Sequence, residues 1–215
     1  MYALLFLPGA ASRGFFFGTP GATDREASRF PEPLGFDVSQ ALSRLFGYTI
    51  PAIALIVCLL VLRGGKTRLP GPPGSRDIRS AALALPGLFG AGLFISFISL
   101  TLFPGAAAVM VEAPQGLPAV IVMFFSCLGA GYLEEFYFRY YLSLRFKEAG
   151  LSIVPAIGLS ALLFSICHLY EGPWGALNAF LAGVLLSLVY KKYRGLHGIA
   201  WAHSLYNVFV YLNGV

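Results

Sequence analysis

The chain has 215 residues, of which 57% are hydrophobic, 15% aromatic and only 12% charged. Soluble domains carry about 25% charged residues, so this composition excludes a water-soluble globule. It equally excludes the disordered, collagenous and nucleic-acid-binding classes. The net charge of +5 is then first an indicator of membrane topology rather than of an anionic partner. The sequence predicts a membrane protein whose surroundings are the lipid bilayer and which has no nucleic-acid partner.

The first 46 residues are the least regular part of the sequence. Residues 2–7 are apolar, but they are too few to cross a bilayer and lack the basic region of a signal peptide. Residues 12–37 are rich in glycine, proline and charge, which is typical of a loop. Residues 37–46 have mixed polarity and predict a short helix at the membrane surface. We expect residues 1–46 to be an N-terminal segment and residues 47–215 to be the integral membrane domain.

Six apolar segments approach the ~20 residues that cross a bilayer core. They are residues 45–62, 80–103, 117–141, 153–169, 173–190 and 198–212. Their apolar residues are continuous rather than alternating, and only helices or closed barrels span lipid. The predicted fold is therefore all-α: a polytopic transmembrane helical bundle of about six spanning helices, with a short N-terminal membrane-associated helix. The last segment is short and partly polar, so we expect it to be tilted or shielded by its neighbours.

Basic residues concentrate in alternate loops. Ten of the 15 follow the first, third and fifth segments: Arg63, Lys66, Arg68, Arg76, Arg79, Arg145, Lys147, Lys191, Lys192 and Arg194. The intervening loops, residues 104–116 and 170–172, hold only Glu112 and Glu171 as charged residues. The positive-inside rule predicts that the basic loops are cytoplasmic and that both chain ends lie outside.

The three cysteines lie inside apolar segments. Cys58, Cys127 and Cys167 include no pair at CxxC spacing, so neither a disulfide framework nor a cysteine-based zinc site is expected. We expect buried thiols that behave as small hydrophobic side chains.

A few ionisable residues remain inside the apolar segments. They are Glu134, Glu135, Arg139, His168 and His203, with Asn207 as a polar companion. A charged group at mid-membrane costs a few kcal/mol or more, so such residues are functional-site candidates by default.

The first pattern is the pair of adjacent glutamates. Glu135 and Arg139 are four residues apart, so they share a helix face and predict a buried ion pair. Glu134 is rotated by about 100° from this face and has no local cation. A carboxylate in that position is a candidate general base. The alternative is a purely structural Glu–Arg clamp between helices.

The second and third patterns also have the spacing of one helical turn. Phe164 precedes His168 by four residues, and His203 precedes Asn207 by four. Taken alone, the pattern at His168 is also compatible with a core histidine whose hydrogen bonds are satisfied. The pattern at His203 is also compatible with an interhelical hydrogen bond of the kind common in membrane proteins.

Hairpin geometry predicts that two of these patterns meet. Glu134 lies 13 residues before Lys147, and His168 lies 13 residues after Pro155. At 1.5 Å per residue, both side chains are then ~20 Å from the same turn and face each other at one depth. By the same count His203 is shallower, so a tilted last helix would have to bring it to the site.

Together, Glu-Glu-x-x-x-Arg, Phe-x-x-x-His and His-x-x-x-Asn on successive membrane helices resemble the CPBP family. These are the CAAX-processing and bacteriocin-processing (Abi) intramembrane endopeptidases. The resemblance covers about residues 117–207 and implies a catalytic core at about 117–212. The segment from Phe180 to Gly183 also looks like the small-residue packing helix of this family.

The resemblance implies a role for each motif residue. Glu134 would activate the attacking water and His168 would assist it. Glu135 and Arg139 would be a supporting ion pair, with Phe164 also supporting, and His203 and Asn207 would donate hydrogen bonds to the oxyanion.

The cofactor expectation follows from the same residues. The resemblance favours a glutamate mechanism without a cofactor. The alternative is a zinc ion held by Glu134, His168 and His203, with an open fourth position. The HExxH motif of classical zinc proteases is absent from the sequence.

The leading hypothesis is an intramembrane endopeptidase of the bacterial inner membrane. It would cleave a membrane-anchored protein or peptide substrate, for example at a C-terminal sorting or prenyl-type tag. One alternative is a non-catalytic membrane immunity or scaffold protein. Another is a proton-coupled transporter that uses Glu134 and His168 as a relay, although no internal repeat is evident in the sequence.

Overall fold

The computed structural model describes residues 46, 53, 56–57, 70–102 and 113–213. Within these residues the chain is helical, with loops and turns between the helices and no strand. The predicted N-terminal segment and nearly all of the first apolar segment, residues 45–62, lie outside the described residues, as does Cys58. The boundary at residue 46 and the positions of both chain ends relative to the membrane therefore stay predictions.

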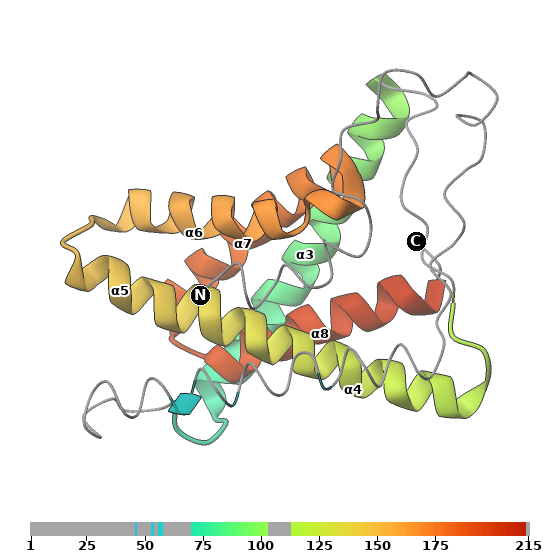
Figure 1. Cartoon of the computed structure of the whole chain (residues 1–215), viewed down its shortest axis with the longest axis horizontal. Helices are drawn as coiled ribbons and strands as arrows, with labels where there is room; N and C mark the ends of the chain where they lie inside the picture. Colours follow the sequence, from blue (N-terminus) through green and yellow to red (C-terminus); the bar gives the residue numbers. More distant parts are fainter. Residues whose placement is uncertain (1–45, 47–52, 54–55, 58–69, 103–112, 214–215) are drawn as a thin grey trace.

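The helices follow the apolar segments of the sequence (Figure 1). They are α3 (Ser75–Leu102), α4 (Gly116–Glu135), the π-helix η1 (Phe136–Tyr141), α5 (Leu142–Glu148), α6 (Ile153–Cys167), the short 3-10 helix η2 (Leu169–Glu171), α7 (Gly172–Tyr193) and α8 (Leu196–Asn213). In this part of the chain, three helical runs are long and apolar enough to cross a membrane: Ser75–Leu102, Gly116–Glu148 and Leu169–Tyr193. Helix α6 is apolar but shorter. The prediction of an all-α membrane bundle is confirmed.

Most of the described basic residues that were predicted in loops lie on helix ends instead, whereas Arg194 lies between α7 and α8 as predicted, and Arg63, Lys66 and Arg68 lie outside the described residues. Arg76 and Arg79 are in the first turns of α3, Arg145 is in α5, and Lys191 and Lys192 are in the last turn of α7. The prediction ended each helix where the apolar run ends. A helix continues past that point because long cationic side chains can extend to the water while their stems stay on apolar surface.

Helices α4, η1 and α5 form one continuous run that pairs with α6 as a hairpin (Figure 1). The turn between them closes at Gly150, which has a φ of 76°. Backbone hydrogen bonds from Ala149 to Arg145 and from Leu151 to Phe146 terminate the first arm. This is the hairpin that the sequence predicted, and it aligns the end of α4 with the end of α6.

Small residues allow the helices to pack closely. Helix α7 packs on α6, where a Cβ atom at Gly183 would lie 3.0 Å from the Ala161 Cα. The expected small-residue packing helix is therefore present. Helix α4 packs on α8, and α3 packs on both α7 and α8. In contrast, α6 contacts the first hairpin arm mainly through η1 and α5, so α4 and α6 have little direct packing.

The two described cysteines form no disulfide with each other. Cys127 is buried and lies with its Sγ 3.8 Å from the Met123 Sδ, and Cys167 is half-buried. Both thiols thus lie among apolar helices, as the sequence predicted.

Helix α8 begins against the first turn of α3. A Cβ atom at Gly198 would lie 2.6 Å from the carbonyl carbon of Asp77 and would contact its carbonyl oxygen even more closely. This neighbour is backbone, so α8 must shift to accept any larger residue. We expect Gly198→Ala to destabilise the protein by about 1–3 kcal/mol, the usual cost of overpacking. Thermal unfolding in detergent measures this change.

Gly158 in α6 provides the matched control. A Cβ atom at that glycine meets nothing within 4 Å, and alanine is the better helix former by up to about 1 kcal/mol. Gly158→Ala should therefore leave the melting temperature unchanged or raise it. Equal melting temperatures for the two variants would contradict the close α3–α8 contact.

Candidate active site

The two glutamates lie where the helix geometry changes. Glu134 and Glu135 are the last residues of α4, and Arg139 lies within the π-helix η1. π-turns inside longer helices occur frequently at functional sites because they change the direction of the side chains around them. The sequence pattern gave no indication of this π-turn.

Glu135 has both carboxylate oxygens engaged. Its Oε2 lies 3.1 Å from Arg139 Nε, and its Oε1 lies 2.8 Å from His203 Nδ1. The side chain is fully buried. An ionised carboxylate can only accept hydrogen bonds, so His203 Nδ1 carries the proton that it donates to Glu135. The predicted Glu135–Arg139 pair is confirmed, and His203 is an additional partner.

Aromatic rings enclose the guanidinium of Arg139. Its Cζ lies 4.6 Å from the ring centre of Phe164 and 5.7 Å from that of Phe138, and the residue is 1% exposed. The terminal nitrogens of Arg139 have no hydrogen-bond acceptor among the described residues. The Glu135 carboxylate and the faces of the two rings therefore compensate this buried cation. This contact explains why a phenylalanine accompanies the polar residues.

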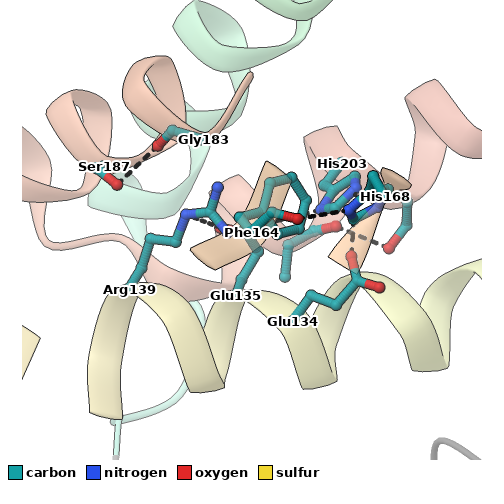
Figure 2. A network of polar contacts seen from close by, with 10 residues as sticks. Glu134, Glu135, Arg139, Phe164, His168, Gly183, Ser187 and His203 are labelled. Atoms are coloured by element: carbon teal, nitrogen blue, oxygen red, sulfur yellow. Dashed lines mark hydrogen bonds and ion pairs between the residues drawn. The ribbon is translucent and has the colours of Figure 1, made fainter. Parts of the chain in front are cut away.

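Glu134 is the less constrained carboxylate. Its Oε2 lies 3.7 Å from His203 Nε2, and its side chain remains 11% exposed. Within the described chain it accepts no hydrogen bond, whereas Glu135 is engaged at both oxygens. Figure 2 shows Glu134 on the same side as His168 and His203, with Arg139 at the opposite end of these polar contacts. The carboxylate of Glu135 is thus fixed by two partners, whereas the carboxylate of Glu134 is free of hydrogen bonds within the described chain.

His168 lies just beyond the end of α6. The sequence placed it inside an apolar segment that continues to residue 169, but α6 ends at Cys167 and His168 is its C-cap. Its Nδ1 lies 2.8 Å from the carbonyl oxygen of Phe164, and its ring centre lies 4.4 Å from that of Phe164. Because the carbonyl accepts, Nδ1 carries the proton and Nε2 retains its lone pair. The shared face of Phe164 and His168 is confirmed.

His203 reaches the depth of the glutamates although residue counting made it shallower. It lies in the second turn of α8, is 6% exposed, and contacts both glutamates. A Cβ atom at Gly131 in α4 would lie 3.0 Å from the carbonyl oxygen of Ala200, so α8 lies very close to α4 at this level. This close approach brings His203 to the end of α4.

Asn207 follows His203 by four residues on α8 and is half-buried. It forms no hydrogen bond with the glutamates or histidines in the described chain, so the structure does not bring it into the cluster of Glu134, Glu135, Arg139 and His203. Its role in binding an oxyanion stays a prediction, as do the roles of the other motif residues.

Asp77 is a structural residue that the sequence analysis missed. Its Oδ2 accepts the Gly74 N–H at 2.9 Å, and its Oδ1 accepts the Gly198 N–H at 3.1 Å. One buried carboxylate thus satisfies the N-terminal amides of α3 and of α8, and α8 carries His203. The signal was an acidic residue in the first helical turn after a stretch rich in glycine and proline.

The three residues considered as zinc ligands do not converge on a common point. Among the described residues, no three His, Cys, Asp or Glu side chains are grouped so that they could hold a metal ion. His203 Nδ1 donates to Glu135, and His168 Nδ1 donates to a backbone carbonyl. Both hydrogen bonds leave the Nε2 atom of the ring available, so the zinc alternative, like the expectation of a cofactor-free site, stays a prediction.

Comparison with known proteins agrees with this geometry. No curated protein and no solved structure shows significant similarity to the chain. A family model described as type II CAAX prenyl endopeptidase Rce1-like matches residues 115–209. The match begins directly before α4 and ends within α8, so it includes all three motifs and the whole cluster. Residues 115–209 are therefore similar to the type II CAAX prenyl endopeptidase Rce1-like family, in agreement with the CAAX-type membrane proteases that the motifs resemble.

Proposed function

We propose that the chain is an intramembrane endopeptidase that hydrolyses a peptide bond through a water activated by Glu134. The observation that carries this proposal is the contrast between the two glutamates. Glu135 is held at both oxygens, whereas the slightly exposed carboxylate of Glu134 accepts no hydrogen bond in the described chain and has only a longer contact, 3.7 Å, with His203 Nε2. A general base needs a free lone pair within reach of water, and only Glu134 offers one in this cluster.

The reaction needs no covalent enzyme intermediate. Glu134 accepts a proton from water as the water oxygen attacks the carbonyl carbon of the scissile bond. His168 Nε2 accepts the second hydrogen bond of that water and orients it. The tetrahedral intermediate then breaks its C–N bond while the proton held by Glu134 passes to the leaving nitrogen. The products are one new carboxylate and one new amine.

His203 is suited to stabilise the oxyanion. Glu135 and Arg139 form a pair with no net charge, so Glu134 is the uncompensated charge of the cluster. A protonated His203 balances it, and burial favours such neutral groups. Its Nε2–H then donates toward the carbonyl oxygen as negative charge develops there. Asn207, one turn further along α8, provides a second donor when the substrate is bound.

The substrate class follows from where the cluster lies. The two glutamates lie on a helical run that is long and apolar enough to cross a membrane, and His168 follows the shorter apolar helix α6, so the scissile bond belongs to a membrane-associated protein or peptide. We propose a substrate with a C-terminal sorting or prenyl-type tag, and a multi-pass location in a bacterial inner membrane. The supporting observations are the matched CAAX-type family and the apolar helices.

The test is co-expression with membrane-anchored reporter peptides. One reporter carries a prenylated C-terminus, one a C-terminal sorting tag and one an N-terminal leader, and mass spectrometry identifies the fragments. We expect the parent protein to produce two fragments whose masses sum to the reporter plus one water. The Glu134→Ala variant should produce neither fragment.

The matched control is Glu148→Ala, which removes a carboxylate from the exposed end of the same helical run. It should cleave like the parent. If the parent and Glu134→Ala yield the same fragments at the same membrane abundance, the endopeptidase proposal is wrong and the scaffold alternative gains support. Loss of cleavage after treatment with a chelator, restored by zinc, would contradict the metal-free mechanism.

A further inference from the structure

A basic cavity lies between the ends of α3, α7 and α8, away from the glutamates. Its volume is about 170 Å³. The lining residues that matter here are Arg76 and Arg194, with Tyr140, Tyr190 and His197 completing the polar wall. We call this space the basic cavity. Nothing in the proposed hydrolysis uses it.

The two arginines of the basic cavity have no acidic partner among the described residues. Asp77 also lines the cavity, but its two oxygens accept the backbone N–H groups of Gly74 and Gly198. His197 is satisfied as well, because its Nδ1 lies 3.1 Å from the Tyr132 hydroxyl and its Nε2 lies 2.9 Å from the Gly71 carbonyl oxygen. Arg194 lies with its Cζ 5.7 Å from the ring centre of Tyr190 and hydrogen-bonds that side chain, so the donors that the cavity offers are its other N–H groups and those of Arg76.

An apolar groove lies further along α3, next to the basic cavity. It has a volume of about 440 Å³ and is lined by Ile78, Ala81, Ala82, Leu85, Pro86 and Trp201. Ile78 directly follows the cavity residues Arg76 and Asp77. On α8, the rings of His197 and Trp201 lie 6.3 Å apart, one turn from each other. The cavity and the groove thus lie next to each other along α3 and α8, with arginines at the first and apolar side chains at the second.

The depth of the two parts in a membrane follows from the length of α3. Its 28 residues extend for about 42 Å at 1.5 Å per residue. The hydrocarbon core is only ~30 Å thick, so a terminal turn of α3 lies at the level of the lipid headgroups. The exposed Arg76 and Arg79 identify that end. The groove then runs from headgroup level into the hydrocarbon.

We propose that this surface binds one anionic phospholipid, with its phosphate in the basic cavity and an acyl chain in the apolar groove. Arginine is suited to this role because its planar fork donates two parallel hydrogen bonds to phosphate oxygens. Basic pockets between membrane helices are typical sites for anionic headgroups. The cavity has two arginines against the single carboxylate of Asp77, and this net positive charge disfavours a zwitterionic headgroup, since its quaternary ammonium would be repelled. The site is independent of the proposed peptidase activity.

Trp201 in the groove provides the readout. The protein carries Trp174→Phe, so that Trp201 is the remaining tryptophan, and is reconstituted with phospholipids whose acyl chains are brominated and quench nearby tryptophan. We expect phosphatidylglycerol to quench Trp201 at a mole fraction at least about threefold lower than phosphatidylcholine with the same chains. Replacing both arginines, Arg76→Gln with Arg194→Gln, should abolish this preference.

The control pair is Lys147→Gln with Lys191→Gln, which removes the same charge from exposed residues outside the cavity. The control pair should keep the preference for phosphatidylglycerol over phosphatidylcholine. Equal quenching by the two lipids in the parent protein would overturn the proposal without any variant, so the test does not depend on whether the arginine variant folds. Loss of the preference in the control pair would also overturn it, because the attraction would then be to the whole basic surface. Displacement by millimolar inorganic phosphate alone would indicate a free-phosphate site instead of a lipid site.

Discussion

Replacement of Glu134 by glutamine is expected to reduce peptide hydrolysis by about 10²–10⁴-fold, the usual contribution of a general base. The amide has nearly the same shape but cannot take a proton from water. Glu134 accepts no hydrogen bond within the described chain and is partly exposed, and the amide oxygen of glutamine still faces His203 Nε2, so little stability should be lost. We therefore expect a change in melting temperature below about 2–4 °C, equivalent to about 1 kcal/mol in a chain of this size.

The neighbouring Glu135→Gln variant provides the comparison. Glu135 is fully buried between Arg139 and His203, so this change should lower both the rate of hydrolysis and the melting temperature. Cleavage rates in reconstituted vesicles and unfolding in detergent measure the two effects. A Glu134→Gln variant that retains parental activity, or that unfolds as readily as Glu135→Gln, would contradict the assignment of a free and a fixed glutamate.

The largest effect on stability is expected for Arg139→Met. Methionine fills much of the same space, but it leaves the buried Glu135 carboxylate with His203 alone and close to the charge of Glu134. Removal of one partner from a buried ion pair costs about 3–5 kcal/mol. Denaturant unfolding of the purified protein in detergent should show a loss of this size, together with loss of cleavage activity.

Arg145→Met is the matched control, because Arg145 forms an ion pair with Glu148 in which the side chains are 34% and 42% exposed. Exposed pairs contribute about 0–1 kcal/mol, so this variant should unfold almost like the parent. Adding Glu135→Gln to Arg139→Met should recover part of the lost stability, since the uncompensated carboxylate is then gone. Equal losses for Arg139→Met and Arg145→Met would contradict a buried pair.

Local spacing predicted the parts of the site that lie within one helical run. The pairing of Glu135 with Arg139 follows from their separation by four residues, and the stacking of Phe164 with His168 follows from the same spacing. The apolar segments likewise predicted α3, α4 and α7, because a helix is the ordinary way for a single segment to satisfy its backbone in lipid.

Contacts between segments distant in the sequence were not predictable in the same way. Residue counting made His203 too shallow, because the depth of α8 depends on its packing against Gly131 and on the Asp77 carboxylate at its first turn. The π-turn at 136–141 was also not foreseen, since the apolar pattern there fits an ordinary α-helix. The sequence therefore identified the candidate residues, and the packing of α8 determined which of them meet.

The uneven packing around the cluster indicates how a polypeptide could reach it. Helices α3 and α8 share the Asp77 carboxylate, and α6 and α7 interlock at Gly183. Separating either pair would break buried contacts, whereas α4 and α6 have little direct packing beside Glu134 and His168. A substrate helix sliding sideways out of the lipid would thus displace the fewest side chains between α4 and α6. We expect this seam to be the lateral entry of the proposed endopeptidase.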